Sequence, residues 1–521
     1  MSAADVEKAP DHEPDSPIEK VMSAKGTEGI QARAHLTEED GDEALKIVHE
    51  EAAGFSMTPE EERALLRKID WHILPLLCIV YGLQFLDKTC LSYSSIMGIQ
   101  QAAGLVGQQY SWLGSIFYFG YLVWEYPTNR LLQRLPLAKY TSFNIIVWGL
   151  VLTCMSGATN FAGLMVVRFF LGLFEASVSP GFALITSQWY KTSEQGARTG
   201  IWFSFNGFAQ IFGGLVAYGL SRGDAAHELS IAGWKVVFIL TGTLTISFGF
   251  VVLAFLPDSP LNARFLTPRE KAMAIERIRG NNQGVGNKHF KWYQFKEAFT
   301  DVRTWLFVSY SLIADIPNGG LTNFFSIIIT SFGYTSQQSL LYGCPAGAVE
   351  VVTLIGFLWL GDRFRNRLVW GAFSETISLL GMVLMYALPT ELKVGRLIGY
   401  YLTGSSATGF VVILSLISSN VAGYTKKTTV SALYLIFYCV GNLIGPQVFQ
   451  AKDAPRYTPA LITIIVCFIL CIFILLGIWY VNHRENVRRD ALRDSPDYVH
   501  VKNQEFLDLT DGENMEFRYR C

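Results

Sequence analysis

Charged residues are scarce in this chain of 521 residues, of which Asp, Glu, Lys and Arg make up only 17%. The sequence has no Walker phosphate loop, no His-Glu-x-x-His pair, no nucleophile-elbow spacing and no paired metal-ligand motif. The run Gly284-x-Gly286 lacks the third glycine and the preceding strand of a dinucleotide-binding loop. We therefore expect neither an enzyme nor an ATP-driven pump, and no cofactor or metal. The formal net charge of −2 gives no indication of a nucleic-acid partner.

Cysteine is also sparse, with eight residues in the chain. All but the last, Cys521, fall inside long apolar stretches, so a disulfide framework is not expected. No cleavable signal peptide is expected either. The first apolar run begins near Ile73 and is long enough to span a membrane, so it would act as its own insertion signal.

Long apolar stretches are what the chain has in quantity. About twelve of them can each cross a hydrocarbon core about 30 Å thick as an α-helix. They lie near residues 73–95, 110–132, 138–158, 161–187, 198–221, 234–256, 303–328, 338–360, 367–388, 395–418, 427–450 and 458–482. This pattern predicts an all-α polytopic membrane protein. Its expected parts are a disordered acidic tail (1–66), a six-helix bundle (67–256), a linker (257–302), a second six-helix bundle (303–482) and a second tail (483–521).

The short loops indicate the orientation in the membrane, because positive charge gathers on the cytosolic side. Lys and Arg follow the second, fourth, eighth and tenth stretches, whereas the alternate loops carry none or offset them with acids. The residues concerned are Arg130, Arg134, Lys139, Lys191, Arg198, Arg363, Arg365, Arg367, Lys426 and Lys427. Both termini and the linker are therefore predicted to be cytosolic. Within the linker, Thr267-Pro-Arg-Glu270 predicts a surface helix that runs to about Arg279.

Two acid and base pairs lie inside the apolar stretches. Arg168 and Glu175 are seven residues apart, which puts both on one face of a helix, and Asp87 and Lys88 are adjacent in an earlier stretch. A charge at bilayer depth costs roughly 3 kcal/mol, so it normally faces a bundle interior or a watered cavity. These pairs indicate a solute pathway with an ionisable switch. The alternatives are a static intrahelical salt bridge in the later stretch and a lysine that reaches toward the interface in the earlier one.

Other polar residues inside the apolar stretches are candidates either for substrate contact or for hydrogen bonds between helices. They are Asn206, Gln210, Asn318, Asn323, Tyr434 and Asn442. Proline and glycine beside Asn318 would break the helix and free backbone groups for a ligand. Glu350 is either a second proton site or an acid satisfied by a neighbouring backbone.

The loop after the eighth stretch, Gly361-Asp-Arg-Phe-Arg-Asn-Arg367, resembles the Gly-x-x-x-Asp-Arg-x-Gly-Arg-Arg loop of the major facilitator superfamily. In that role Asp362, Arg363 and Arg367 would make and break contacts as two bundles rock, with Arg130 at the equivalent place in the first half. The alternative is anchoring by positive charge alone.

Several separated motifs resemble the fungal allantoate permease family, in the anion:cation symporter branch of the major facilitator superfamily. They are Trp71-His-Ile-Leu-Pro75, Leu83-Gln-Phe-Leu-Asp87-Lys88, Tyr126-Pro-Thr-Asn-Arg130, Arg168 to Gly181, Leu256-Pro-Asp-Ser-Pro260, Asn420-Val-Ala-Gly-Tyr-Thr-Lys-Lys427 and Gly441-Asn-Leu-Ile-Gly-Pro-Gln447. The resemblance implies the major facilitator fold and a monomer in the plasma membrane. It also implies proton-coupled uptake of a small organic anion, such as allantoate, nicotinate or another vitamin acid. By this resemblance, Lys88 and Arg168 would bind the anion, while Asp87 and Glu175 would carry the proton.

An anion near Arg168 would compete with Glu175 for the same positive charge. Substrate and proton would then each favour binding of the other, and coupling follows if only the empty or doubly loaded carrier changes its facing. Two other functions remain open at this point. One is export of a secondary metabolite, and the other is a nutrient-sensing receptor with low flux.

Overall fold

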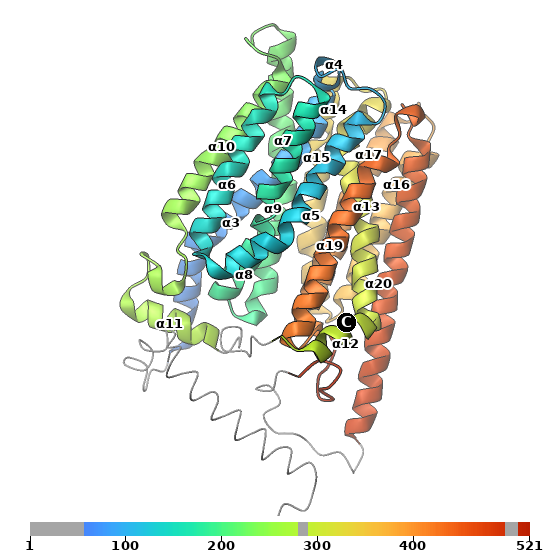
Figure 1. Ribbon diagram of the computed structural model, residues 1–521. Helices are drawn as coiled ribbons and strands as arrows, with labels where there is room; N and C mark the ends of the chain where they lie inside the picture. The colour runs from blue at the N-terminus through green and yellow to red at the C-terminus, as the bar shows by residue number, and fades with distance from the viewer. Residues whose placement is uncertain (1–56, 280–289, 495–508) are drawn as a thin grey trace, which may run out of the picture.

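The computed structural model describes residues 57–279, 290–494 and 509–521, and within these ranges the chain is helical and has no β-strand. Figure 1 shows two groups of long helices standing side by side. The short helices α11 (Pro268–Arg279) and α12 (Trp292–Thr300) lie at one end, which we call the linker end. The opposite end, where the short helix α4 (Ile99–Ala102) lies, is called the far end.

Each group contains six segments of spanning length, some of them broken into two helices. The first group consists of α3 (Pro59–Ser95), α5 (Gln109–Arg134), α6 (Leu137–Cys154), α7 (Phe161–Glu175) with α8 (Val178–Trp189), α9 (Thr192–Ala225) and α10 (Gly233–Phe255). The second consists of α13 (Val302–Ser331), α14 (Ser336–Tyr342) with α15 (Cys344–Arg363), α16 (Arg367–Ala387), α17 (Lys393–Thr403) with α18 (Ala407–Asn420), α19 (Tyr424–Val448) and α20 (Thr458–Arg493). The predicted all-α polytopic fold is confirmed.

Ten of these segments are long and apolar enough to cross a membrane by composition alone. The two that are not, α5 and α9, are long enough, with 26 and 34 residues, but are more polar. Both lie between the groups, because α5 packs along α19 and α9 packs along α15. Polar side chains in a membrane protein turn toward such interior faces, so reduced hydropathy marks the helices that line the centre.

The two groups approach each other most closely where glycines face each other. A Cβ added to Gly207 of α9 would lie 2.3 Å from the carbonyl oxygen of Gly347 of α15. Within the second group, a Cβ on Gly441 or Gly445 of α19 would lie 2.5 or 2.4 Å from a carbonyl oxygen of α13. These distances leave no room for a side chain, so the small residues set the helix spacing.

The helices at the two ends of the spanning region extend into the segments predicted as tails, 1–66 and 483–521. Helix α3 begins at Pro59, well before the apolar run, because Thr58 and Glu61 form a capping box. Helix α20 continues past residue 482 to Arg493. The apolar stretches mark only the parts of these helices that are hydrophobic on all sides, whereas the extensions are stabilised by charged neighbours. The first 56 residues of the predicted acidic tail lie outside the described residues.

The linker helix α11 coincides with the predicted surface helix and is fastened to the first group by ion pairs. Arg277, whose side chain is fully buried, contacts Glu62 of α3 and Glu194 of α9. Lys68 of α3 also lies 2.8 Å from Glu270 of α11. The early start of α3 therefore serves to reach α11, because its first turns carry the acids and the lysine that hold the linker helix.

Candidate functional site

A cavity of about 780 Å³ lies between the two groups of helices. Its walls come from α3, α5, α8 and α9 on one side and from α13, α15, α17, α18 and α19 on the other. The lining reaches the linker end, where it includes Gly196 at the start of α9 and Asp362 and Lys427 on the opposite side. The volume is that of a site for a small organic molecule, and its opening faces the linker end.

The far end is closed by direct contacts between the two groups. Ser92 donates to Ser326 at 3.1 Å, and Tyr110 donates to the carbonyl oxygen of Asn323 at 2.7 Å. Ser111 and Ser115 of α5 donate to carbonyl oxygens of the second group at 3.1 and 2.7 Å. The cavity is thus accessible from the linker end only.

Lys88 of α3 is a cation on the cavity wall, and it forms an ion pair with Glu175. The two charged groups are 3.0 Å apart, and the side chain of Lys88 is 16% exposed whereas that of Glu175 is fully buried. The lysine therefore lies between the cavity and the carboxylate. A ligand carboxylate in the cavity can reach the ammonium group only in competition with Glu175.

Asp87 and Lys88 point to different faces of α3, as expected for adjacent helical residues. Asp87 accepts a hydrogen bond of 2.6 Å from the Trp148 indole on α6 and is fully buried behind the cavity wall. Its Oδ1 atom has no hydrogen-bond partner among the described residues. Asp87 therefore does not pair with Lys88. A proton from the cavity can reach Asp87 only through the interior of the first group.

Arg168 lies deeper than Lys88 and does not line the cavity in this conformation. Its Nε atom donates to the carbonyl oxygen of Leu113 at 3.2 Å, and its guanidinium lies 5.5 Å from the centre of the Phe117 ring. Glu175 pairs with Lys88 of another helix, and in the described chain the intrahelical salt bridge between Arg168 and Glu175 is not formed. Gly172, which lies between Arg168 and Glu175, lets α5 pack directly against α7 at this point and so separates the two side chains. A Cβ placed on Gly172 would lie 1.9 Å from the carbonyl oxygen of Phe117 on α5.

In the second group, the residue that sequence analysis missed is Asp315 of α13. It lines the cavity, and its Oδ1 atom accepts hydrogen bonds from Asn442 at 3.0 Å and from Asn318 at 3.4 Å. Its Oδ2 atom has no partner among the described residues. Asp315 lies in the same apolar stretch as the candidates Asn318 and Asn323 but was not itself predicted as a site residue. The usable signal was a further carboxylate inside an apolar stretch, which by itself implies an interior position.

The remaining polar candidates divide between the cavity wall and the helix contacts. Asn206, Gln210, Asn318 and Glu350 line the cavity, and Gln210 donates to Tyr400 at 3.0 Å across the two groups. The structure places three others in helix contacts: Asn442 holds Asp315, Asn323 donates to the Gly319 carbonyl oxygen, and Tyr434 donates to the Phe410 carbonyl oxygen.

Aromatic residues form much of the rest of the wall, which sequence analysis did not foresee. The cavity lining includes Tyr81, Tyr118, Trp202, Phe325, Phe410 and Tyr438. Tyr118 and Tyr438 face each other across the groups with ring centres 6.1 Å apart. Away from the mouth, the charged groups of the lining are Lys88, Asp315 and Glu350. Together with the amides and these rings, they suit a small polar molecule with a negative end and a flat or apolar body.

At the mouth, Asp362 and Arg367 form an ion pair of 2.6 Å, and Arg367 also contacts Ser415 of α18. Both residues line the opening. Arg363 is exposed beside them, and Arg130 is exposed near the linker end of α5. The predicted gating residues therefore lie at the linker end, and their role in gating stays a prediction.

Two helical groups around a cavity with polar and aromatic walls, shut at one end, define the class of a polytopic membrane transporter. A family model described as Major Facilitator Superfamily matches residues 77–446. A bacterial homolog of the human lysosomal transporter Spinster, in an inward-facing and unoccupied conformation, has the same fold. Its TM-score is 0.56 at 17% identity, and the match covers 81% of this chain and 96% of that one.

Similar sequences point to a narrower group. An uncharacterized transporter of Schizosaccharomyces pombe is 48% identical over 463 residues, which are 88% of this chain and 90% of that protein. The allantoate permease of Saccharomyces cerevisiae is 41% identical over 491 residues, covering 92% and 90%. A thiamine pathway transporter of the same yeast is 35% identical and covers 91% and 89%. The chain belongs to the major facilitator superfamily and, within it, to the fungal allantoate permease family, so it is a transporter and not an enzyme.

Proposed function

We propose that this transporter takes up a small organic anion together with a proton across the plasma membrane. The anion is allantoate, a related ureide or another small carboxylate such as nicotinate. In this proposal the linker end and both termini are cytosolic, the far end is extracellular, and the protein acts as a monomer. The name of the allantoate permease relative and the positive loops support this assignment.

The observation that carries the proposal is the ion pair between Lys88 and Glu175 on the cavity wall. A substrate carboxylate that binds Lys88 removes the counter-charge from Glu175. A buried carboxylate without a counter-charge takes up a proton. Substrate and proton therefore load together, since each makes the other more favourable by the same free energy.

The buried acids give the proton places to reside. Glu175 receives it when the substrate takes over Lys88, and Asp87 lies behind it with an oxygen that has no partner among the described residues. Across the cavity, Asp315 and Glu350 are carboxylates on the other wall, deeper than Asp362 at the mouth. Asp315 is held by two asparagine side chains, and its other oxygen is buried without a partner among the described residues.

The loaded carrier releases its cargo toward the linker end and returns empty. For this change the contacts at the far end must open while Asp362, Arg367 and the start of α9 approach one another. An unprotonated Glu175 that holds Lys88 neutralises the wall of the empty carrier, which allows the return step.

The proposal is tested by expressing the chain in a yeast that lacks its own ureide permease. Uptake of labelled allantoate is measured in acidic and slightly alkaline medium, with nicotinate, biotin, pantothenate and dipeptides as competitors. We expect faster uptake in acid, its collapse with a protonophore, and its loss in Lys88→Gln. Lys139→Gln is the matched control, because its side chain is 69% exposed and its ion pair lies outside the cavity. Uptake that does not depend on pH would contradict proton coupling.

A further inference from the structure

The last described residues, 509–521, lie against the linker end of the second group of helices, where Figure 1 marks the C-terminus. We call this segment the strap. It has turns but no helix, and it follows α20 in the chain. The strap has no part in the proposed transport mechanism. It nevertheless makes many polar contacts with parts of the protein that are far apart in sequence.

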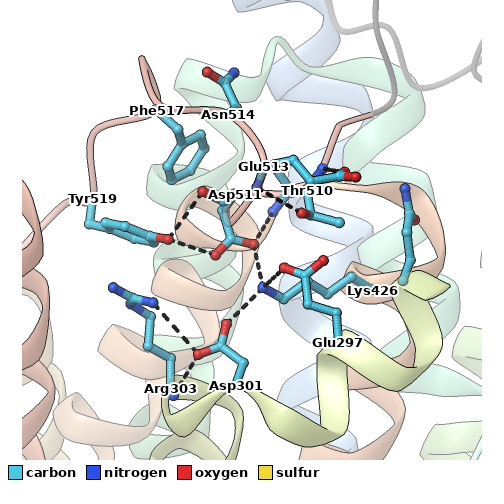
Figure 2. A network of polar contacts seen from close by, with 12 residues as sticks. Glu297, Asp301, Arg303, Lys426, Thr510, Asp511, Glu513, Asn514, Phe517 and Tyr519 are labelled. Carbon is cyan, nitrogen blue, oxygen red and sulfur yellow. Dashed lines mark hydrogen bonds and ion pairs between the residues drawn. The ribbon is translucent and has the colours of Figure 1, made fainter. Parts of the chain in front are cut away.

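The strap supplies one of three carboxylates around a buried lysine. Lys426, in the first turn of α19, has a side chain that is 1% exposed, and its ammonium lies 2.9 Å from Asp511 of the strap. It also lies 2.9 Å from Glu297 of α12 and 2.7 Å from Asp301, which caps α13 (Figure 2). A buried charge is stable only with close partners, so Asp511 ties the strap to α12, α13 and α19 at one point.

A second buried cation binds the strap's backbone. The guanidinium of Arg489 in α20 donates to the carbonyl oxygens of Asp511, Asn514 and Phe517 at 2.8 to 2.9 Å. Tyr519 donates to Asp511 at 2.8 Å (Figure 2). The guanidinium of Arg489 lies 4.8 Å from the centre of the Tyr519 ring. The rigid fork of the arginine thereby fixes the shape of the strap, because it satisfies several carbonyl groups at once.

The end of the strap reaches the rim of the cavity mouth. Arg520 and Asn420, the last residue of α18, exchange two hydrogen bonds of 2.8 Å. The backbone N–H of Arg367, at the start of α16, donates to the carbonyl oxygen of Cys521 at 2.8 Å. Arg520 itself lines the opening of the cavity beside Lys427. The strap therefore joins the buried charge cluster to the surface against which the first group must close.

We propose that the strap is a latch that holds the linker ends of α16, α18, α19 and α20 together as one side of the mouth. Its contacts go to backbone groups at helix ends and to buried polar side chains, each of which would lose a partner without the strap. With the strap in place, these ends move as one body when the mouth opens and closes. Arg520 is then the strap's own side chain on that rim. This role is separate from the identity of the substrate.

The latch is tested first by removing residues 509–521 and adding them back as a labelled synthetic peptide. The purified truncated protein should bind the peptide saturably, and the full chain should not, because its site is occupied. A peptide with Asp511→Asn should bind roughly ten- to a hundredfold more weakly, the loss expected for one hydrogen bond to a buried charge. Met515→Ala is the matched control peptide, since Met515 is 38% exposed, and it should bind like the parent.

Hydrogen exchange shows whether the strap holds the rim. In the truncated protein the N–H of Arg367, and that of Ala422, which donates to Asp511 at 3.3 Å, should exchange faster, and added peptide should slow them again. Residues 193–199, on the first-group side of the mouth, should not change. The full chain with Asp511→Asn gives the same test if the truncation does not fold.

Two results would overturn the latch. One is equal binding of the parent and Asp511→Asn peptides, or no peptide binding at all. The other is unchanged exchange at Arg367 and Ala422 after the strap is removed or its aspartate is neutralised. None of these measurements needs a transported substrate. Failure of the latch proposal can therefore be distinguished from failure of the proposed transport function.

Discussion

Lys88 and Glu175 form the most consequential contact in this structure, and the energy of the pair can be worked out for one substitution. Lys88→Gln removes the ammonium 3.0 Å from a carboxylate that is fully buried. An ion pair broken in this way costs about 3–5 kcal/mol if the remaining charge persists. Protonation of Glu175 limits the loss. A glutamate carboxyl has an unperturbed pKa of about 4.3, so protonating it at neutral pH costs about 4 kcal/mol. Each unit by which the pH is lowered reduces this cost by about 1.4 kcal/mol.

The variant should therefore be less stable by about 3–4 kcal/mol at neutral pH and by much less in acid. Lys88→Gln with Glu175→Gln should recover most of the loss, because no charge is left unpaired. The assay is thermal unfolding of the purified proteins in detergent at several pH values. Lys139→Gln is the control, since an exposed pair contributes about 0–1 kcal/mol. A double variant no more stable than Lys88→Gln, or a loss that does not depend on pH, would refute this reasoning.

Three further predictions concern packing, closure and the buried acid. Gly207→Ala should lower the yield of folded protein sharply, because its Cβ meets a carbonyl oxygen at 2.3 Å, whereas Gly219→Ala on the same helix, with nothing within 4 Å, should not. Tyr110→Phe removes the 2.7 Å bond to Asn323 across the far end, so a cysteine introduced into the cavity wall by Asn318→Cys should be labelled several-fold faster from that side. An unchanged rate would show that this bond does not hold the end shut. Trp148→Phe removes the only hydrogen-bond donor to Asp87 among the described residues. The pH at half-maximal uptake should therefore change while surface expression does not, and an identical pH profile would argue against a proton on Asp87.

The positions of the spanning helices could be predicted well from the sequence, because apolar stretches of the right length have few alternatives in a membrane. The structure differs from the sequence prediction where polar residues line the cavity or hold another helix. Helices α5 and α9 fall below the hydropathy of the others because they face the cavity. Helix α3 begins early because its first turn is capped and binds α11.

The candidate site was predictable as a set of residues but not as a set of contacts. Helical spacing places Arg168 and Glu175 on one face, yet it does not say which neighbouring helix that face meets. In the structure α3 supplies Lys88 to Glu175, and α5 supplies a carbonyl oxygen to Arg168. Asp315 was missed because its importance arises from Asn442, a residue more than a hundred positions away.

The contacts of the strap lie furthest from what the sequence could reveal. Lys426 reads as one more positive loop residue, and its burial among three carboxylates depends on a segment that follows the last span. Periodicity carries no information about how such a segment folds back.

The central claim is that substrate and proton load together because both act on the pair of Lys88 and Glu175. The most direct measurement is proton uptake by the purified transporter when allantoate or nicotinate is added in weakly buffered solution near neutral pH. The account predicts that a substrate which binds takes up protons from solution, and that Glu175→Gln binds it with clearly reduced proton uptake. Binding without any proton uptake by the native protein, or the same proton uptake by Glu175→Gln, would contradict it.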